Sequence, residues 1–166
     1  MCSSDLTAIS VVKVTDDGKW FVKEIEYGRW DVRETASKIL LKMRDYRPMS
    51  VGIEKGALKN AVLPYLSDLM RKSNVYSHIV DLTHGNRKKA DRIIWSLQGR
   101  FEHGRIVLNS EENWDEFIDQ LLLFPSIGVH DDLIDSLSYI DQLAVTSYFV
   151  DDQEDDWEPV DVISGV

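Results

Sequence analysis

The order of the apolar segments constrains the fold of this chain more than any other feature of its sequence. Two short β-branched runs, residues 6–14 and 20–26, flank an Asp17-Gly18 step. Such a step predicts a β-hairpin, because glycine tolerates a positive φ. Beyond the hairpin, short apolar runs alternate with segments whose apolar residues recur at helical spacing. A hairpin followed by alternating strands and helices predicts an α/β sheet.

The later segments are placed by their periodicity and by the residues that interrupt them. Pro48 marks the end of the first helix, and Pro64 predicts either a kink or a late start in the second. The expected helices are 31–46, 57–72, 86–102, 112–124 and 131–150, and the expected later strands are 51–54, 78–82 and 106–108.

Length and composition predict one soluble domain. A chain of 166 residues can bury a real hydrophobic core. No apolar run approaches the roughly 18 residues of a membrane span, and no basic-then-apolar signal peptide is present. The single cysteine, Cys2, excludes an internal disulfide. We therefore expect a domain over residues 1–150 and an acidic tail, 151–166, whose composition is typical of disorder.

The distribution of charge matters more than the net charge of −10, which by itself argues against a nucleic-acid partner. The tail holds five Asp and two Glu without Lys or Arg, so it accounts for −7 and leaves −3 for the rest of the chain. A basic stripe lies between positions 84 and 105 and consists of Arg87, Lys88, Lys89, Arg92, Arg100 and Arg105. Contacts to DNA phosphates and a solvated helix face are both compatible with this stripe.

The stretch 128–137 carries the strongest chemical signal, because three carboxylates fall within five residues where a loop enters an apolar helix. Asp132 and Asp135 are three residues apart and share a helix face, and Asp131 adjoins them. Crowded carboxylates repel one another unless a cation lies between them, and hard oxygen ligands suit Mg²⁺ or Mn²⁺. The alternative is an acidic N-terminal cap that complements the helix dipole.

Four further residues gain meaning beside this cluster. Glu54 ends a short apolar run. A carboxylate at the end of a strand can face an acidic helix and complete a cation site. A lone Glu at such a position is more often a solvated loop residue. Lys89 and Arg92 share a helix face. In one interpretation this face is directed at DNA phosphates or at the acidic site. In the other, the two side chains form ion pairs with acids on neighbouring turns. His130 suits orienting a carboxylate or binding a phosphate better than ligating a hard metal.

The segments 5–12, 51–54, 89–93, 101–106, 124–125 and 130–137, read in order, resemble the nuclease domain of the large terminase subunit of tailed phages. The resemblance covers residues 5–145. It implies a ribonuclease H-like mixed sheet flanked by helices, and hydrolysis of duplex DNA by a two-metal mechanism with Mg²⁺ or Mn²⁺. The implied acidic residues are Glu54, Asp131, Asp132 and Asp135, with Asp5 at a secondary acidic position near the metals.

The resemblance also implies the partners. These are duplex DNA, the phage portal and the small terminase subunit, in the cytoplasm of the host cell. The packaging motor is an oligomer, whereas the isolated domain is expected to be a monomer. The DNA contacts would come from Lys89, Arg92, Arg87, Lys88, Arg105 and His130. The acidic tail resembles the portal-docking C-terminal region of terminases, and a tail that only promotes solubility is the alternative.

One departure from the family concerns the centre of the sheet. Family members have a central strand ahead of the segment that matches 5–12, and that strand carries the first catalytic Asp. This sequence starts at Met1-Cys2-Ser3-Ser4, so we expect that strand to be absent, together with the ATPase domain, whose phosphate-loop motif does not occur. Either the hairpin slides inward, another segment fills the gap, or the chain is a fragment.

Two other functions remain open. An incomplete nuclease could dock DNA or a portal without cutting. A Holliday-junction resolvase is the other alternative, because the spacing of Asp132 and Asp135 also resembles that group.

Overall fold

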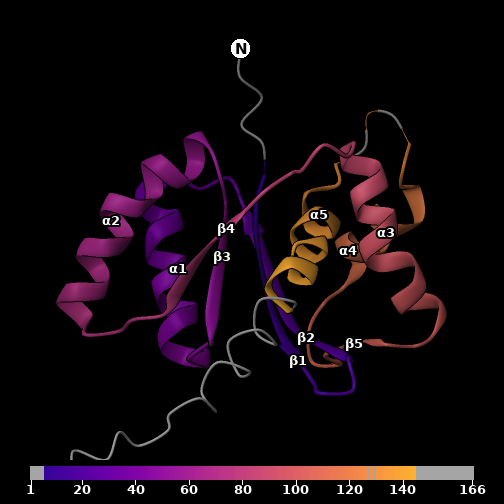
Figure 1. Cartoon of the computed structure of the whole chain (residues 1–166), viewed down its shortest axis with the longest axis horizontal. Coiled ribbons are helices and arrows are strands. Elements are labelled where there is room, and N and C mark those ends of the chain that lie inside the picture. Colours follow the sequence, from indigo (N-terminus) through magenta and orange to yellow (C-terminus); the bar gives the residue numbers. More distant parts are fainter. Residues whose placement is uncertain (1–5, 127, 129, 145–166) are drawn as a thin grey trace, which may run out of the picture.

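The computed structural model describes residues 6–126, 128 and 130–144 and shows an α/β fold with helices flanking its strands (Figure 1). The expected hairpin is confirmed: β1 (Thr7–Val14) pairs antiparallel with β2 (Trp20–Gly28). The short strand β5 (Ile106–Leu108) pairs parallel with the first residues of β2. These strands form a mixed sheet in the order β1-β2-β5.

A second sheet contains β3 (Ser50–Glu54) and β4 (His78–Leu82), which run parallel. Gly52 of β3 lies directly against Leu82, and a Cβ atom at this glycine would come within 2.7 Å of that side chain. The close approach explains a glycine inside a strand. Because the two strands are parallel and in register, their carboxyl ends, Glu54 and Leu82, lie at the same edge.

The helices gather in two groups on either side of β1 (Figure 1). The first group, α1 and α2, packs with the second sheet around a core that contains Met43, Ile53 and Leu66. The second group, α3 to α5, packs with the first sheet around a core that contains Trp20, Leu97 and Leu137. The helices are α1 (Val32–Tyr46), α2 (Ala57–Ser73), α3 (Lys89–Glu102), α4 (Asp115–Leu123) and α5 (Asp132–Ser138).

A local capping signal fixes the start of α1. Asp31 caps α1 by accepting from the backbone N–H of Glu34, whose side chain accepts in return from the N–H of Asp31. α3 starts at Lys89 and α4 at Asp115, each three residues later than expected. The last helix was expected to run to residue 150, but α5 ends at Ser138, Tyr139 forms a turn, and 140–144 are helical again. Residues 145–150 lie outside the described residues.

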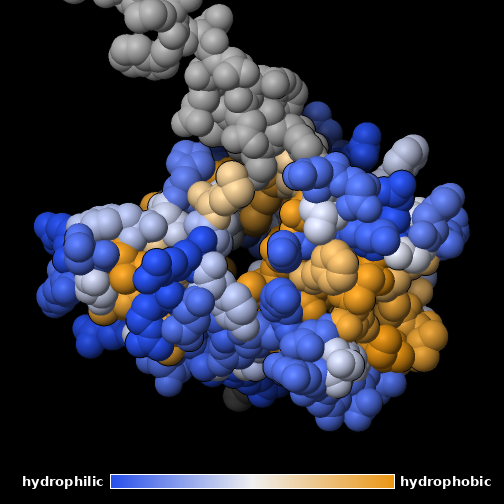
Figure 2. Space-filling model, turned by 90° about the horizontal axis from the view of Figure 1, so that it is seen from below, coloured by the Kyte–Doolittle hydropathy of each residue, from blue (hydrophilic) through white to orange (hydrophobic). Residues whose placement is uncertain are grey.

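The expected gap at the centre of the sheet is present. β1 and β3 belong to separate sheets, and in the described part of the chain no strand pairs with the second edge of β1. Ala8 and Val12 pack on one core and Ile9 on the other, yet no residue of β1 is fully buried. Figure 2 shows a hollow between the part with α1 and α2 and the part with α3 to α5. Apart from exposed Lys13, the residues of β1 are therefore only half-buried.

Within the described part of the chain, no helix has the length and hydrophobicity needed to cross a bilayer.

Candidate acidic site

The fold brings five of the predicted site residues to one place between the two groups of helices. Glu54 is the last residue of β3, and Lys89 and Arg92 belong to the first turn of α3. Asp131 and Asp135 lie at the start of α5. The loop after β4 adds His84, so residues from β3, α3, α5 and a connecting loop meet at the carboxyl ends of two parallel strands. This edge is where open α/β sheets commonly place their sites.

The centre of the site is a buried ion pair between Arg92 and Asp135. Arg92 is 7% exposed and Asp135 is 8% exposed, and Nη2 of the arginine donates to Oδ1 of the aspartate. The guanidinium also lies 4.5 Å from the ring centroid of Tyr139. Arg92 Nε is buried and has no hydrogen-bond partner among the described residues. The ion pair neutralises a carboxylate that would otherwise be costly to bury.

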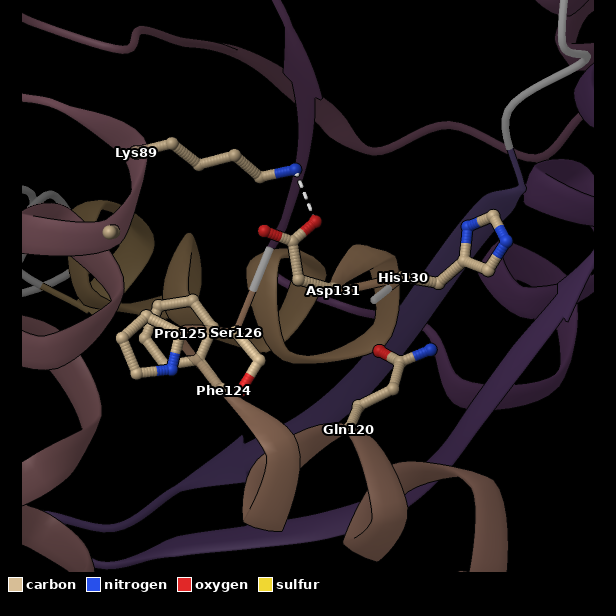
Figure 3. A pocket seen from close by; sticks show the side chains of 8 residues that line it. Lys89, Gln120, Phe124, Pro125, Ser126, His130 and Asp131 are labelled. Atoms are coloured by element: carbon tan, nitrogen blue, oxygen red, sulfur yellow. Dashed lines mark hydrogen bonds and ion pairs between the residues drawn. The ribbon is translucent and has the colours of Figure 1, made fainter. Parts of the chain in front are cut away.

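Lys89 supplies a second cation to the site, and Figure 3 shows its contact with Asp131. Its Nζ lies 2.7 Å from Oδ1 of Asp131 and 3.2 Å from Oδ2 of Asp135. Burial lowers the pKa of Lys89, but its bonds to Asp131 and Asp135 outweigh burial and raise the pKa above its ordinary value. The ammonium is therefore charged at neutral pH and bridges the two aspartates.

His84 connects the other acid to this pair. Nε2 of His84 contacts Oε1 of Glu54, while Nδ1 lies 2.8 Å from Nη1 of Arg92 and 3.0 Å from the hydroxyl of Tyr139. Arginine can only donate hydrogen bonds, so Nδ1 must accept and the proton resides on Nε2, which donates to Glu54. Glu54, His84, Arg92 and Asp135 thus form one continuous chain of polar contacts.

Tyr139 closes this network from the far end of α5. Burial raises the pKa of Tyr139 to about 12, and the negative charges of Glu54 and Asp135 add to the effect while Arg92 opposes it. The phenol therefore keeps its proton at neutral pH. Tyr139 is a site residue that the sequence motifs do not single out. Its position four residues after Asp135, on the same helical face, is the signal that was available.

The remaining predicted acid, Asp132, lies beside His130. Nδ1 of His130 is 3.7 Å from Oδ2 of Asp132, whose side chain is 22% exposed. Buried Gln120 of α4 accepts a hydrogen bond from the backbone N–H of Leu133 at 3.0 Å. This contact fixes the first turn of α5, and with it the three aspartates.

A small pocket opens beside the Lys89–Asp131 contact (Figure 3). Its volume is about 200 Å³. It lies between the start of α3, the end of α4 and the loop before α5. The lining residues are Lys89, Ala90, Gln120, Phe124, Pro125, Ser126, His130 and Asp131.

The donor set has the chemistry of a Mg²⁺ or Mn²⁺ site, but the arrangement does not fit a metal ion. Hard carboxylate oxygens from Glu54, Asp131 and Asp135 suit these cations. In this structure they are bonded instead to His84, Lys89 and Arg92. Among residues 6–126, 128 and 130–144, no three His, Cys, Asp or Glu side chains are grouped so that they could hold a metal. The shared cation between Glu54 and Asp132 stays a prediction.

The predicted DNA-binding residues divide into two sets. Arg92 and Lys89 form ion pairs with Asp131 and Asp135. Of the orientations predicted for these two residues, the structure therefore shows the one toward the acidic site. Arg105 donates to the backbone carbonyl of Asp17 at 2.6 Å and holds the hairpin turn. Arg87 and Lys88 are exposed ahead of α3, and the guanidinium of Arg87 lies 5.3 Å from the ring centroid of Trp95. Two other predicted features, Asp5 and the acidic tail 151–166, lie outside the described residues.

The chain matches no known sequence family, and no curated protein sequence is significantly similar to it. The solved structures that resemble it include the following three. RuvC from Thermus thermophilus in complex with a Holliday junction is 12% identical, with 87% of this chain and 90% of that chain covered and a TM-score of 0.49. A second structure of Thermus thermophilus RuvC is 12% identical, with 87% and 92% covered and a TM-score of 0.45. The fowlpox virus resolvase with its Holliday-junction substrate is 15% identical, with 81% and 91% covered and a TM-score of 0.46.

Proposed function

We propose that this chain is a DNA nuclease domain of the ribonuclease H-like class and, more finely, the nuclease domain of a phage terminase large subunit. The observation that carries the proposal is the meeting of Glu54 with Asp131 and Asp135. Glu54 is far from the two aspartates in the sequence, yet polar contacts through His84 and Arg92 join it to Asp135. Lys89 in turn joins Asp135 to Asp131. The motif 130–137 and Glu54 are among the residues that carry the resemblance to the terminase nuclease domain.

The residues of the chain have distinct roles in this proposal. Glu54, Asp131 and Asp135 are the acidic groups of the reaction centre, and Mg²⁺ or Mn²⁺ is the cation that phosphodiester hydrolysis by carboxylates normally uses. His84 and Arg92 hold two of these carboxylates in fixed positions. Arg87 and Lys88, exposed ahead of α3, contact DNA phosphates, which give affinity without sequence readout.

A second candidate is a module that binds DNA, or a portal, without cutting it. The observation that favours it is that each of these acids is bonded to a cation or a histidine of the same chain. A third candidate is a junction-resolving nuclease. Two of the similar solved structures are described as complexes with Holliday junctions, so four-way junctions belong among the substrates to be tested.

Cleavage assays distinguish the three candidates. Supercoiled plasmid, linear duplex and a four-way junction are each incubated with the chain in Mg²⁺, Mn²⁺ or Ca²⁺. The proposal predicts slow cutting of all duplex forms in Mg²⁺ or Mn²⁺. The variants Glu54→Gln and Asp135→Asn should not cut. The control variant Asp119→Asn changes an exposed acid on α4 and should cut normally. Preference for the junction favours a resolvase. Binding without cutting, also in a chain extended upstream, favours the binding module.

A further inference from the structure

Trp95 is a largely exposed tryptophan on α3. It is 74% exposed, although Ser96 and Leu97, which follow it directly, are buried. Tryptophan normally buries most of its large ring, so an exposed one calls for an explanation. The guanidinium of Arg87, which precedes the helix, lies over the ring at 5.3 Å from its centroid. Such a contact favours one orientation of the ring and covers one of its faces.

The next turn of the helix leaves the ring of Trp95 uncovered. Side chains on a helix lean toward its N-terminus, so the residue four positions later is the one that would lie over the ring. That residue is Gly99, and a Cβ atom at this glycine would meet no described atom within 4 Å. Glycine inside a helix is destabilising relative to alanine. Packing does not explain Gly99, whereas an open ring beside it does.

The charges beside the ring indicate which kind of partner it fits. Arg87 and Lys88 are exposed directly ahead of α3, and their two positive charges exceed the one negative charge of Asp91 in the first turn. An exposed aromatic ring next to cations that can bind phosphates is the combination with which proteins hold single-stranded nucleic acid. The charge of this surface therefore favours a DNA strand over an apolar protein partner.

We propose that Trp95, with Arg87 against it, is a stacking platform for an unpaired base of a bound DNA strand. The inference rests on the proposed DNA-binding function and names its substrate class, which is duplex DNA that carries unpaired bases at a gap, a frayed end or a junction. Every base has a π face, so stacking of this kind needs no particular sequence. The bases of an intact duplex are stacked on one another and are not available to Trp95.

The platform can be tested by binding alone. Fluorescence anisotropy without divalent cations compares two labelled DNAs of the same sequence, an intact duplex and a duplex with a short single-stranded gap. The wild-type chain should bind the gapped duplex more tightly. Trp95→Ala should lose roughly 5- to 150-fold of the affinity for the gapped duplex, as expected for one stacked base, and should bind the intact duplex like the wild type. Trp95→Phe keeps an aromatic ring and should retain the preference.

A matched control removes a similar pair from α2. The guanidinium of Arg33 also lies 5.3 Å from an aromatic ring centroid, that of Tyr65. Four residues after this tyrosine, however, α2 carries Leu69 where α3 carries Gly99. Tyr65→Ala should therefore bind both DNAs like the wild type.

A second variant closes the platform without removing the ring. Gly99→Gln leaves Trp95 in place and adds a long side chain that leans over it. This variant should lose the preference for the gapped duplex. Its melting temperature should not fall, because glutamine forms helices better than glycine does. A loss of preference in a fully folded variant is then assigned to the covered ring.

The outcomes separate the platform from the proposed function. A loss in Trp95→Ala that is confined to the gapped duplex supports the platform. An equal loss on both DNAs, or no loss on either, overturns it while the binding of intact duplex still supports the proposed function. If the wild type binds neither DNA, the proposed function fails and the platform fails with it. If Trp95→Ala instead turns a dimer into a monomer in analytical ultracentrifugation and leaves both DNA affinities unchanged, this face joins two copies of the chain and the platform is overturned.

Discussion

At the scale of single residues, the acidic site shows how far sequence patterns predict chemistry. Glu54, Asp131 and Asp135 were singled out from their positions at a strand end and a helix start, and the structure brings them to one edge. The direction of Lys89 and Arg92 could not be predicted, because a basic pair on a helix face serves phosphates and carboxylates equally well. The pairing is decided by α5, which packs beside α3 and brings Asp135 to Arg92.

The buried pair leads to a prediction about stability. Arg92→Met should lower the free energy of unfolding by about 3 kcal/mol, because Asp135 would remain buried without its guanidinium partner. Urea unfolding followed by circular dichroism measures the change. Adding Asp135→Asn should recover part of the loss, since no uncompensated charge remains. A loss below about 1 kcal/mol in the single variant would mean that Asp135 is not held by Arg92.

At the scale of elements, lysines of α1 tie this helix to strand β2. Nζ of Lys42 lies 2.8 Å from both Glu24 and Glu26, and Lys38 also pairs with Glu26. Periodicity predicted the helix and alternation predicted the strand, but neither pattern shows which face of the sheet a helix covers. That choice depends on the cores, because Ala36, Ile39 and Met43 of α1 must be buried against the second sheet and α2.

These ion pairs predict a dependence of stability on pH. Burial raises the pKa of Glu26, but its hydrogen bonds and charge attraction to Lys38 and Lys42 outweigh burial, so the pKa lies below the ordinary 4.5. A lowered pKa stabilises the folded state above pH 4.5, and this contribution is lost as the pH falls through the folded value. Lys42→Met should therefore cost up to about 1 kcal/mol at pH 7, and the difference from wild type should shrink in acid.

The control for this prediction lies on the same strand. Lys23 of β2 is exposed, and Lys23→Met should leave the stability almost unchanged at every pH. Thermal unfolding of the three proteins between pH 3 and pH 7 measures the effect. A gap between Lys42→Met and wild type that stays constant down to pH 3 would contradict the assignment to Glu26.

The start of α3 leads to a prediction about DNA. Arg87 and Lys88 are exposed, whereas Lys89 is held by Asp131 and Asp135. The double substitution Arg87→Ala and Lys88→Ala should weaken binding to all duplex sequences alike. The slope of log affinity against log salt concentration should become less steep by up to about two units, one for each phosphate contact. Without divalent cations, Lys89→Ala should change the slope little. Fluorescence anisotropy of labelled duplex DNA at several salt concentrations measures this salt dependence. If the double variant shows the same slope as the wild type, Arg87 and Lys88 belong only to a solvated helix face.

At the scale of the whole molecule, the split between two sheets is the main feature. The order of elements, and the gap expected from the terminase resemblance, agree with the separate sheets of β1 and β3. Neither a sliding hairpin nor another described segment closes the gap. The sequence could not show how the molecule tolerates the opening. The structure answers this with two independent cores, each built from its own helices and strands.

The open edge of β1 predicts that an added strand would stabilise the fold. The edge presents unpaired backbone groups, and residues 6–12 contain no charged side chain or proline that would protect it. A strand of Val, Ile and Thr fused ahead of Leu6 through an Asn-Gly turn should pair with β1, raise the melting temperature and slow hydrogen exchange of the β1 amides. A fused strand with a central proline is the control. Equal exchange with both fusions would show that the edge is already covered.

The central proposal is that Glu54, Asp131 and Asp135 form the acidic centre of a DNA nuclease domain that works with Mg²⁺ or Mn²⁺. Nuclear magnetic resonance tests it directly, because bound Mn²⁺ broadens only the signals of nearby amides. In the presence of duplex DNA, Mn²⁺ should first broaden the amides of these three residues. Broadening that begins elsewhere in the chain would contradict the account.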